Sequence, residues 1–120
     1  MNALLTSVSD PDGRPILDAA TRAEVGRAPI RTVADLDRAI DAARSAQPGW
    51  AALGHAERSR LLHLVADDLD AHADELGEIV TAEQGKIDGA GEVHGAAHWL
   101  RAAADTVLEP QVLREEGASR

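Results

Sequence analysis

Residues 32–44 read TVADLDRAIDAAR, a stretch with a clear helical pattern. Thr32 followed three residues later by Asp35 is a helix start of the capping-box type, with aspartate in place of the usual Glu or Gln. Apolar side chains then recur at helical spacing, at Val33, Leu36, Ile40 and Ala43. The sequence predicts a helix to about Ala46, ended by Gln47-Pro48-Gly49, because proline cannot continue the hydrogen-bond ladder.

Three further helices are predicted downstream. A linker at Trp50–Gly54 separates the first helix from the second, which begins at about Ala56. The third helix spans about Ala73 to Gln84. The fourth spans about Gly91 to Val107, and Leu108-Glu109-Pro110 closes it. The connections are only a few residues long, so a four-helix bundle is the simplest arrangement.

The apolar stripes of these three helices are narrow and depend on alanine. They consist of Leu61, Leu62, Val65 and Leu69 in the second helix, Leu76, Ile79 and Val80 in the third, and Val93, Ala96, Ala97, Leu100 and Ala104 in the fourth. A free-standing bundle needs large side chains to fill its centre, and alanine contributes little burial. We therefore expect a chain that requires something else to pack against.

The first thirty residues differ from the rest because they are rich in turn formers. Asp10-Pro11-Asp12-Gly13 is a turn sequence, and short β-compatible runs lie near Leu4–Val8 and Glu24–Ile30. The predicted fold is mainly α: an extended or β-hairpin region over residues 1–31, a helical segment over 32–110 and a polar tail over 111–120, which we expect to be frayed.

The composition excludes several classes of function. A net charge of −9 argues against nucleic-acid binding, which selects for basic patches. The chain has no cysteine, and hence no disulfide, no thiolate nucleophile and no cysteine-ligated metal. It shows neither a secretion signal at its start nor 18 consecutive apolar residues, so we expect a cytoplasmic protein without a membrane span.

Two glycine patterns superficially suggest phosphate binding. Gly89, Gly91 and Gly95 have the spacing G-x-G-x-x-x-G, which is not the dinucleotide fingerprint, and they follow a helix where that motif follows a strand. Gly85-Lys86 resembles the end of a P-loop, but Ile87 stands where Ser or Thr is needed. We interpret Gly85 as the cap of the third helix and the other glycines as turn and packing positions.

His94 and His98 stand four residues apart on the fourth predicted helix, the spacing that lets two imidazoles reach one metal ion. Residue 95 is glycine, where the zinc-protease pattern requires glutamate. We favour helix-surface histidines and keep a small metal-binding protein as a rival hypothesis. The many acids, including Asp67, Asp68, Asp70, Asp74 and Glu75, are interpreted as solvated helix faces. No nucleophile, base and orienting group come together in this sequence, so a catalytic site is not predicted.

Several segments in register resemble the N-terminal region of NAD(P)-dependent aldehyde dehydrogenases. Residues 18–29, DAATRAEVGRAP, are similar to that family's Asn-Pro-Ala-Thr-Gly-Glu-Val stretch, with Asp18-Ala19 in place of Asn-Pro. The other similar segments are 32–44 in the first helix, 50–53 (WAAL) in the linker, 56–62 (AERSRLL) at the start of the second helix, 83–86 (EQGK) at the end of the third and 99–101 (WLR) in the fourth. The connection over residues 87–91 is a few residues shorter than the family's.

The resemblance implies a reaction and the parts that perform it. Family members oxidise an aldehyde to a carboxylic acid with NAD or NADP, using a cysteine nucleophile, a glutamate base, an oxyanion-binding asparagine and a parallel Rossmann sheet. Those parts lie beyond the segment that these 120 residues resemble. The helices would pack around that coenzyme domain, which would account for their narrow stripes.

From the resemblance we expect a truncated or split aldehyde dehydrogenase that is inactive alone and binds no cofactor by itself. The alternative is a non-enzymatic helical interaction module that docks on a full-length homologue or on a separately encoded remainder. Some family members also bind a monovalent cation between a backbone carbonyl and an acid, and the matching positions here are Leu17 and Glu83.

Overall fold

In the computed structural model, residues 4, 6 and 9–108 are described, and their first strands form a β-hairpin. Strand β1 (Arg14–Leu17) pairs antiparallel with β2 (Glu24–Ala28). The predicted hairpin is confirmed, but its first strand follows the Asp10–Gly13 turn, in which the Gly13 N–H donates to Asp10 O at 2.9 Å. Of the run near Leu4–Val8 only Leu4 and Thr6 are described, and both are helical, so the β interpretation is wrong for these two residues.

Four helices follow the hairpin: α2 (Val33–Ala52), α3 (His55–Ala71), α4 (Ala73–Gln84) and α5 (Gly89–Asp105). The mainly helical fold class is therefore confirmed. At the start of α2 the capping box is complete: the Asp35 N–H donates to Thr32 Oγ1, and the Thr32 N–H donates to Asp35 Oδ2 at 2.8 Å. Gly85 caps α4 with φ 71°, the left-handed conformation that glycine adopts at no steric cost.

The predicted end of the first helix is wrong. Helix α2 continues through Pro48 to Ala52, so the linker to α3 is only Leu53 and Gly54. A proline ring fixes φ at a value that suits a helix, but its missing N–H removes one hydrogen bond from the ladder and its ring crowds the carbonyl four residues earlier, at a cost of about 3 kcal/mol. The alanines on both sides of Pro48-Gly49 are strong helix formers and support this continuation.

The fourth helix is also displaced from its predicted bounds. It begins at Gly89 because the Asp88 side chain caps it, accepting from the Gly91 N–H at 2.8 Å. It ends at Asp105, where Thr106 Oγ1 turns back to donate to Ala102 O. The residues predicted to close it, Leu108-Glu109-Pro110, therefore lie beyond its end.

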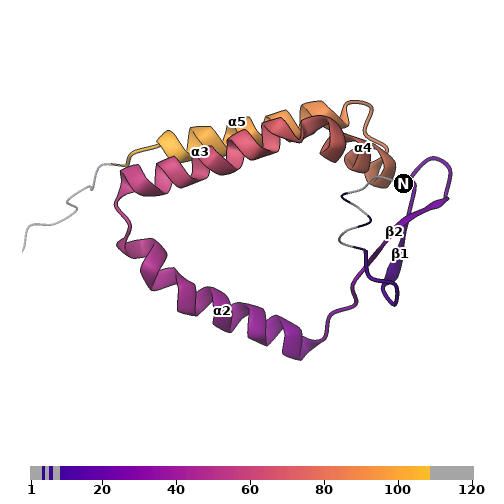
Figure 1. Ribbon diagram of the computed structural model, residues 1–120, viewed down its shortest axis with the longest axis horizontal. Coiled ribbons are helices and arrows are strands. Elements are labelled where there is room, and N and C mark those ends of the chain that lie inside the picture. The colour runs from indigo at the N-terminus through magenta and orange to yellow at the C-terminus, as the bar shows by residue number, and fades with distance from the viewer. Residues whose placement is uncertain (1–3, 5, 7–8, 109–120) are drawn as a thin grey trace, which may run out of the picture.

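The core is small and consists of small residues where α5 packs against α3 and against α4; α3 and α5 run side by side in Figure 1. Ala66 of α3 and Ala97 of α5 are fully buried, and Val93 is 7% exposed. Val65, part of the predicted stripe of α3, is instead 52% exposed. The alanines at the contact let α3 and α5 approach closely. The residue of α3 that is buried there is Ala66, next in sequence to the predicted Val65.

Helices α4 and α5 cross at two glycines. A Cβ on Gly77 would lie 2.4 Å from Ala90 N, and one on Gly89 would lie 2.0 Å from Gly77 O. No other residue fits at either position without moving backbone. This crossing fixes how α4 packs on α5.

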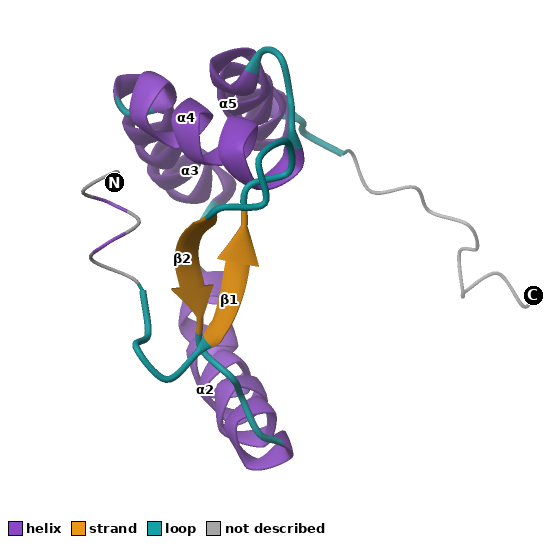
Figure 2. Cartoon of the chain, turned by 90° about the vertical axis from the view of Figure 1, so that its right-hand side faces the viewer, coloured by secondary structure: helices purple, strands orange, loops and turns teal. Residues whose placement is uncertain are grey.

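Helix α2 stands apart from the other three helices in both Figure 1 and Figure 2. It contains no buried residue and packs extensively against no other described element. The hairpin contacts α4, where the Ala19 N–H donates to Ala82 O at 2.8 Å. The Cα radius of gyration is 20.5 Å, against about 14 Å for a compact domain of this length. No helix in the described part of the chain is long and apolar enough to cross a membrane.

Candidate functional site

The densest group of charged side chains joins α3 to α5. Arg101 of α5 donates to two acids of α3, to Asp70 Oδ2 at 2.7 Å and to Asp67 Oδ1 at 2.6 Å. His94 Nδ1 lies 2.7 Å from Asp70 Oδ1, and one end of the same interface holds His63 Nε2 at 2.7 Å from Asp105 Oδ1. These residues form what we call the α3–α5 ion network: His63, Asp67, Asp70, His94, Arg101 and Asp105.

The histidines and Arg101 of the network keep two of its aspartates ionised. The hydrogen bond from His94, followed by that from Arg101, lowers the pKa of Asp70. The hydrogen bond from His63 lowers the pKa of Asp105 in the same way. Both acids are therefore held ionised, as ion-pair partners and not as general acids. The interpretation of the α3 acids as solvated faces is confirmed for Asp67, whose side chain is 66% exposed although it binds Arg101. Asp70 differs, because it is half-buried and binds both His94 and Arg101.

The two histidines of the metal hypothesis contact different side chains. His94 uses Nδ1 to bind Asp70, whereas the His98 ring packs edge-on against Trp99 at a centroid distance of 5.6 Å. Both side chains are exposed on α5, as expected for helix-surface histidines. Among the described residues, no three His, Asp or Glu side chains form a group able to hold a metal ion.

The glycines at the start of α5 do not form a dinucleotide site. Gly89 follows a loop rather than a strand, and the Gly91 N–H is occupied by the Asp88 carboxylate. A pyrophosphate binds a helix N-terminus through such free N–H groups, and a carboxylate in their place repels it. The residues present therefore do not fit NAD or NADP, and no step of coenzyme chemistry is assigned to them.

The Gly85-Lys86 pair is a helix end and not a phosphate loop. Gly85 caps α4, and its N–H donates to Thr81 O at 2.8 Å. Lys86 Nζ lies 2.9 Å from Glu92 Oε1, which ties the connection to the first turn of α5. The interpretation of Gly85 as a helix cap is confirmed.

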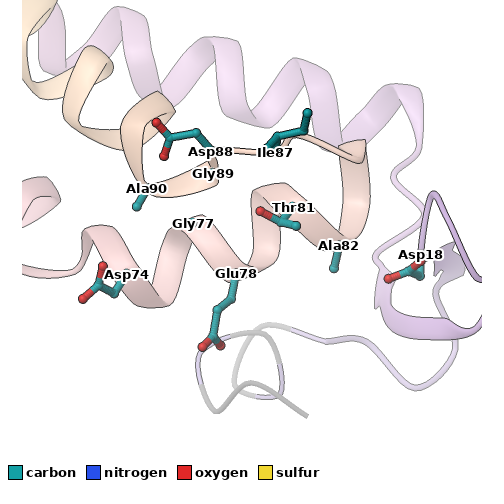
Figure 3. Close-up of a pocket in the computed structure, with 10 residues that line it drawn as sticks. All are labelled: Asp18, Asp74, Gly77, Glu78, Thr81, Ala82, Ile87, Asp88, Gly89 and Ala90. Carbon is teal, nitrogen blue, oxygen red and sulfur yellow. The ribbon is translucent and has the colours of Figure 1, made fainter.

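An open hollow of about 680 Å³ lies beside the α4–α5 crossing, and ten residues line it. Four of them are acids, Asp18, Asp74, Glu78 and Asp88, which Figure 3 shows spread along the hollow rather than converging on one point. Asp18 accepts from the N–H groups of Ala20 and Thr21, and these bonds lower the pKa of Asp18. Asp18 and Asp88 thus serve as backbone caps.

The predicted cation-site residues lie in two segments that touch. Leu17 is the last residue of β1, and Glu83 is half-buried in the last turn of α4. The hydrogen bond from Ala19 to Ala82 joins these segments. Binding of a cation by this pair stays a prediction.

Sequence reasoning missed the role of Arg101. The sequence places His94 and Arg101 seven residues apart, and Asp67 and Asp70 three residues apart. Each spacing puts both members on one helix face. That signal was present, but only the packing of α3 on α5 shows that the two faces meet.

The structure therefore defines a hairpin-and-helix scaffold with no group of side chains placed for catalysis among the described residues. The family model described as "Aldehyde dehydrogenase family" matches residues 7–117. This chain belongs to the aldehyde dehydrogenase family, whose members use NAD(P).

Three relatives illustrate the similarity. A probable aldehyde dehydrogenase from a Pseudomonas species is 35% identical over 115 residues, which are 94% of this chain and 23% of the relative. The lactaldehyde dehydrogenase of Escherichia coli is 36% identical over 103 residues, covering 78% of this chain and 22% of that protein. A 3,6-anhydro-α-L-galactose dehydrogenase from Streptomyces coelicolor is 39% identical over 84 residues, covering 68% and 17%. The chain thus spans about a fifth of the length of these relatives.

Proposed function

We propose that these 120 residues serve as the N-terminal scaffold of an aldehyde dehydrogenase and have no catalytic activity alone. The reaction they would support is the NAD(P)-dependent oxidation of an aldehyde to a carboxylic acid, carried out by the remaining polypeptide. The observation that carries this proposal is the combination of a family match over residues 7–117 with a sequence that lacks cysteine. A cysteine is the nucleophile in the family's chemistry, and no other residue here is placed to replace it.

The packing supports the same proposal. Among the residues that the structure describes, the buried apolar side chains lie in α3, α4 and α5, and α2 contains no buried residue. Large apolar side chains such as Leu36 and Leu64 are more than half exposed. Exposed apolar surface of this extent is typical of a segment that packs against further protein.

Activity measurements test the proposal directly. The purified chain, incubated with NAD or NADP and a panel of aldehydes, is expected to give no reduced coenzyme above the rate without protein. Mixing it with the lactaldehyde dehydrogenase of E. coli shortened by its matched N-terminal segment is expected to give a stable complex. Reproducible turnover by the 120-residue chain alone would overturn the proposal.

A second candidate function is an interaction module that docks on a full-length homologue. Its support is the apolar stripe of α2, which is exposed along the whole helix. Mixing the chain with the complete lactaldehyde dehydrogenase separates the two possibilities. Binding to the complete enzyme favours the module, whereas binding only to the shortened enzyme favours the scaffold.

The scaffold proposal includes a monovalent cation held by the Leu17 carbonyl and the Glu83 carboxylate. Its support is that the segments carrying them are joined by a backbone hydrogen bond. In the complex with the shortened enzyme, melting in sodium chloride is expected to occur at a higher temperature than in choline chloride. Glu83→Gln should remove this difference, and a difference that persists in the variant would count against the site.

A further inference from the structure

We propose that the free 120-residue chain forms a two-fold dimer in which helix α2 packs antiparallel against α2 of a second copy. This inference goes beyond the scaffold function, because it concerns the chain without the rest of an enzyme. It rests on the exposure of α2, on the spacing of its apolar residues and on the charges beside them.

The exposed apolar residues of α2 form one seam. Val33 is 76% exposed, Leu36 57%, Ile40 39% and Trp50 41%, so the helix presents its large side chains to solvent throughout. In Figure 1 the helix stands clear of the others along its length. Nothing within the described part of the chain competes with a second copy for this surface.

The spacing of the seam is that of a coiled coil. Five apolar residues and one polar residue, Gln47, alternate by three and four over the full length of the helix: Val33, Leu36, Ile40, Ala43, Gln47 and Trp50. Alternation by three and four is the a/d heptad pattern, in which each side chain enters a hole on the facing helix. Pro48 and Gly49 occupy b and c positions of the same pattern, on the face away from the seam.

The charges beside the seam favour the antiparallel arrangement. Asp37 and Arg44 both occupy e positions, and in an antiparallel pair e faces e of the partner. Asp37 of each copy then faces Arg44 of the other, which gives two symmetric ion pairs. In a parallel pair the same residues face Thr32 and Ala39, which carry no charge.

These two charges are available for such pairing. Asp37 makes no ion pair with any residue that the structure describes, and Arg44 has only a loose one, with Asp41 at 3.7 Å. The core layers match the same register, in which Ile40 packs on Ala43 of the second copy and Val33 packs on Trp50 at each end. The seam and its flanking charges therefore specify one register.

Sedimentation equilibrium of the complete chain tests the dimer. Between about 1 and 100 µM the wild-type chain should pass from monomer to dimer, and no larger species should form. Ala43→Asp should weaken association at least about 100-fold, because it buries a carboxylate in the seam. The matched control is Ala42→Asp, the same change one residue away on the outer face, and it should leave association within about twofold of wild type.

The orientation is tested by charge reversal. Asp37→Arg and Arg44→Asp should each weaken the dimer by about tenfold, because each creates two like-charged pairs. The double variant restores opposite charges in the antiparallel register and should associate within about threefold of wild type. Circular dichroism of every variant must show the same helical content for the comparison to count.

Three results would overturn the dimer. The first is a wild-type chain that stays monomeric at 100 µM. This result counts against the dimer whether or not the chain binds a shortened family member through α2. The second is equal disruption by Ala42→Asp and Ala43→Asp. The third is failure of the double charge reversal to restore association. None of these measures turnover, so failure of the dimer is distinguishable from failure of the proposed scaffold function.

Discussion

The three packed helices α3, α4 and α5, here called the α3–α5 unit, and helix α2 are both alanine-rich regions, yet only the unit has a core. In the unit, Ala66 and Ala97 are fully buried and two glycines let α4 cross α5 closely. In α2 the side chains are larger, and Leu36 is 57% exposed. Burial in this chain therefore follows the closeness of the neighbouring backbone and not the size of the apolar residue.

The largest expected effect comes from filling the α4–α5 crossing. Gly77→Ala should lower the free energy of unfolding by about 2–3 kcal/mol, because its Cβ would meet backbone atoms of Ala90 and not a movable side chain. Urea denaturation followed by circular dichroism measures this change. Gly95→Ala is the matched control, since a Cβ there meets nothing within 4 Å. It should raise stability by about 0.5–1 kcal/mol, and equal losses from both changes would contradict the crossing.

A smaller effect is expected from truncating one apolar side chain in each region. Val93→Ala should cost about 1–2 kcal/mol, because it leaves a cavity between α4 and α5. Ile40→Ala should lower the free energy of unfolding by less than about 0.5 kcal/mol, because the Ile40 side chain is not buried and its removal leaves no cavity. Both are measured by urea denaturation at a protein concentration well below that of dimer formation. A cost at Ile40 equal to that at Val93 would show that α2 is packed in the free chain.

Much of this architecture was predictable from local signals. The capping box at Thr32 and Asp35 marked the start of α2, and the third helix was predicted with the bounds Ala73 and Gln84 that the structure gives. These features depend on hydrogen bonds within one turn. Residues close together in the sequence are therefore enough to predict them.

The wrong or missing predictions concern features that depend on residues far apart in the sequence, or on opposing local preferences for and against helix. Pro48 was expected to end α2, but its local cost is offset by the helix-forming residues around it. The strand Arg14–Leu17 was missed because its pattern becomes visible only when it pairs with Glu24–Ala28. Arg101 bridges two acids about 30 residues earlier in the chain, which requires knowing that α3 packs on α5.

Acid should weaken the α3–α5 ion network, because protonation removes the charge of its aspartates. The pKa of Asp70 is lowered in the folded state, chiefly by its hydrogen bond from His94, and that of Asp105 is lowered by His63. A depressed folded pKa means that the stabilisation is present above the unfolded value of about 4 and is lost as the pH falls below it. Asp70→Asn should therefore lower the Tm by about 2–4 °C at pH 6, and its difference from wild type should shrink steadily as the pH falls below about 4. Calorimetry across this pH range measures both, and an unchanged Tm at pH 6 would show that the network does not stabilise the unit.

The smallest effect is expected from the same kind of change in α2. The pKa of Asp35 is also lowered, first by the hydrogen bond from the Thr32 backbone N–H, so its contribution is likewise lost below about pH 4. Because α2 packs extensively on no other described element, Asp35→Asn should fray roughly one turn of helix and leave the Tm of the α3–α5 unit unchanged. The measurement pairs ellipticity at 222 nm with calorimetry at pH 6. Asp70→Asn should shift the Tm and Asp35→Asn should not, and a similar shift from both would mean that the two regions melt as one.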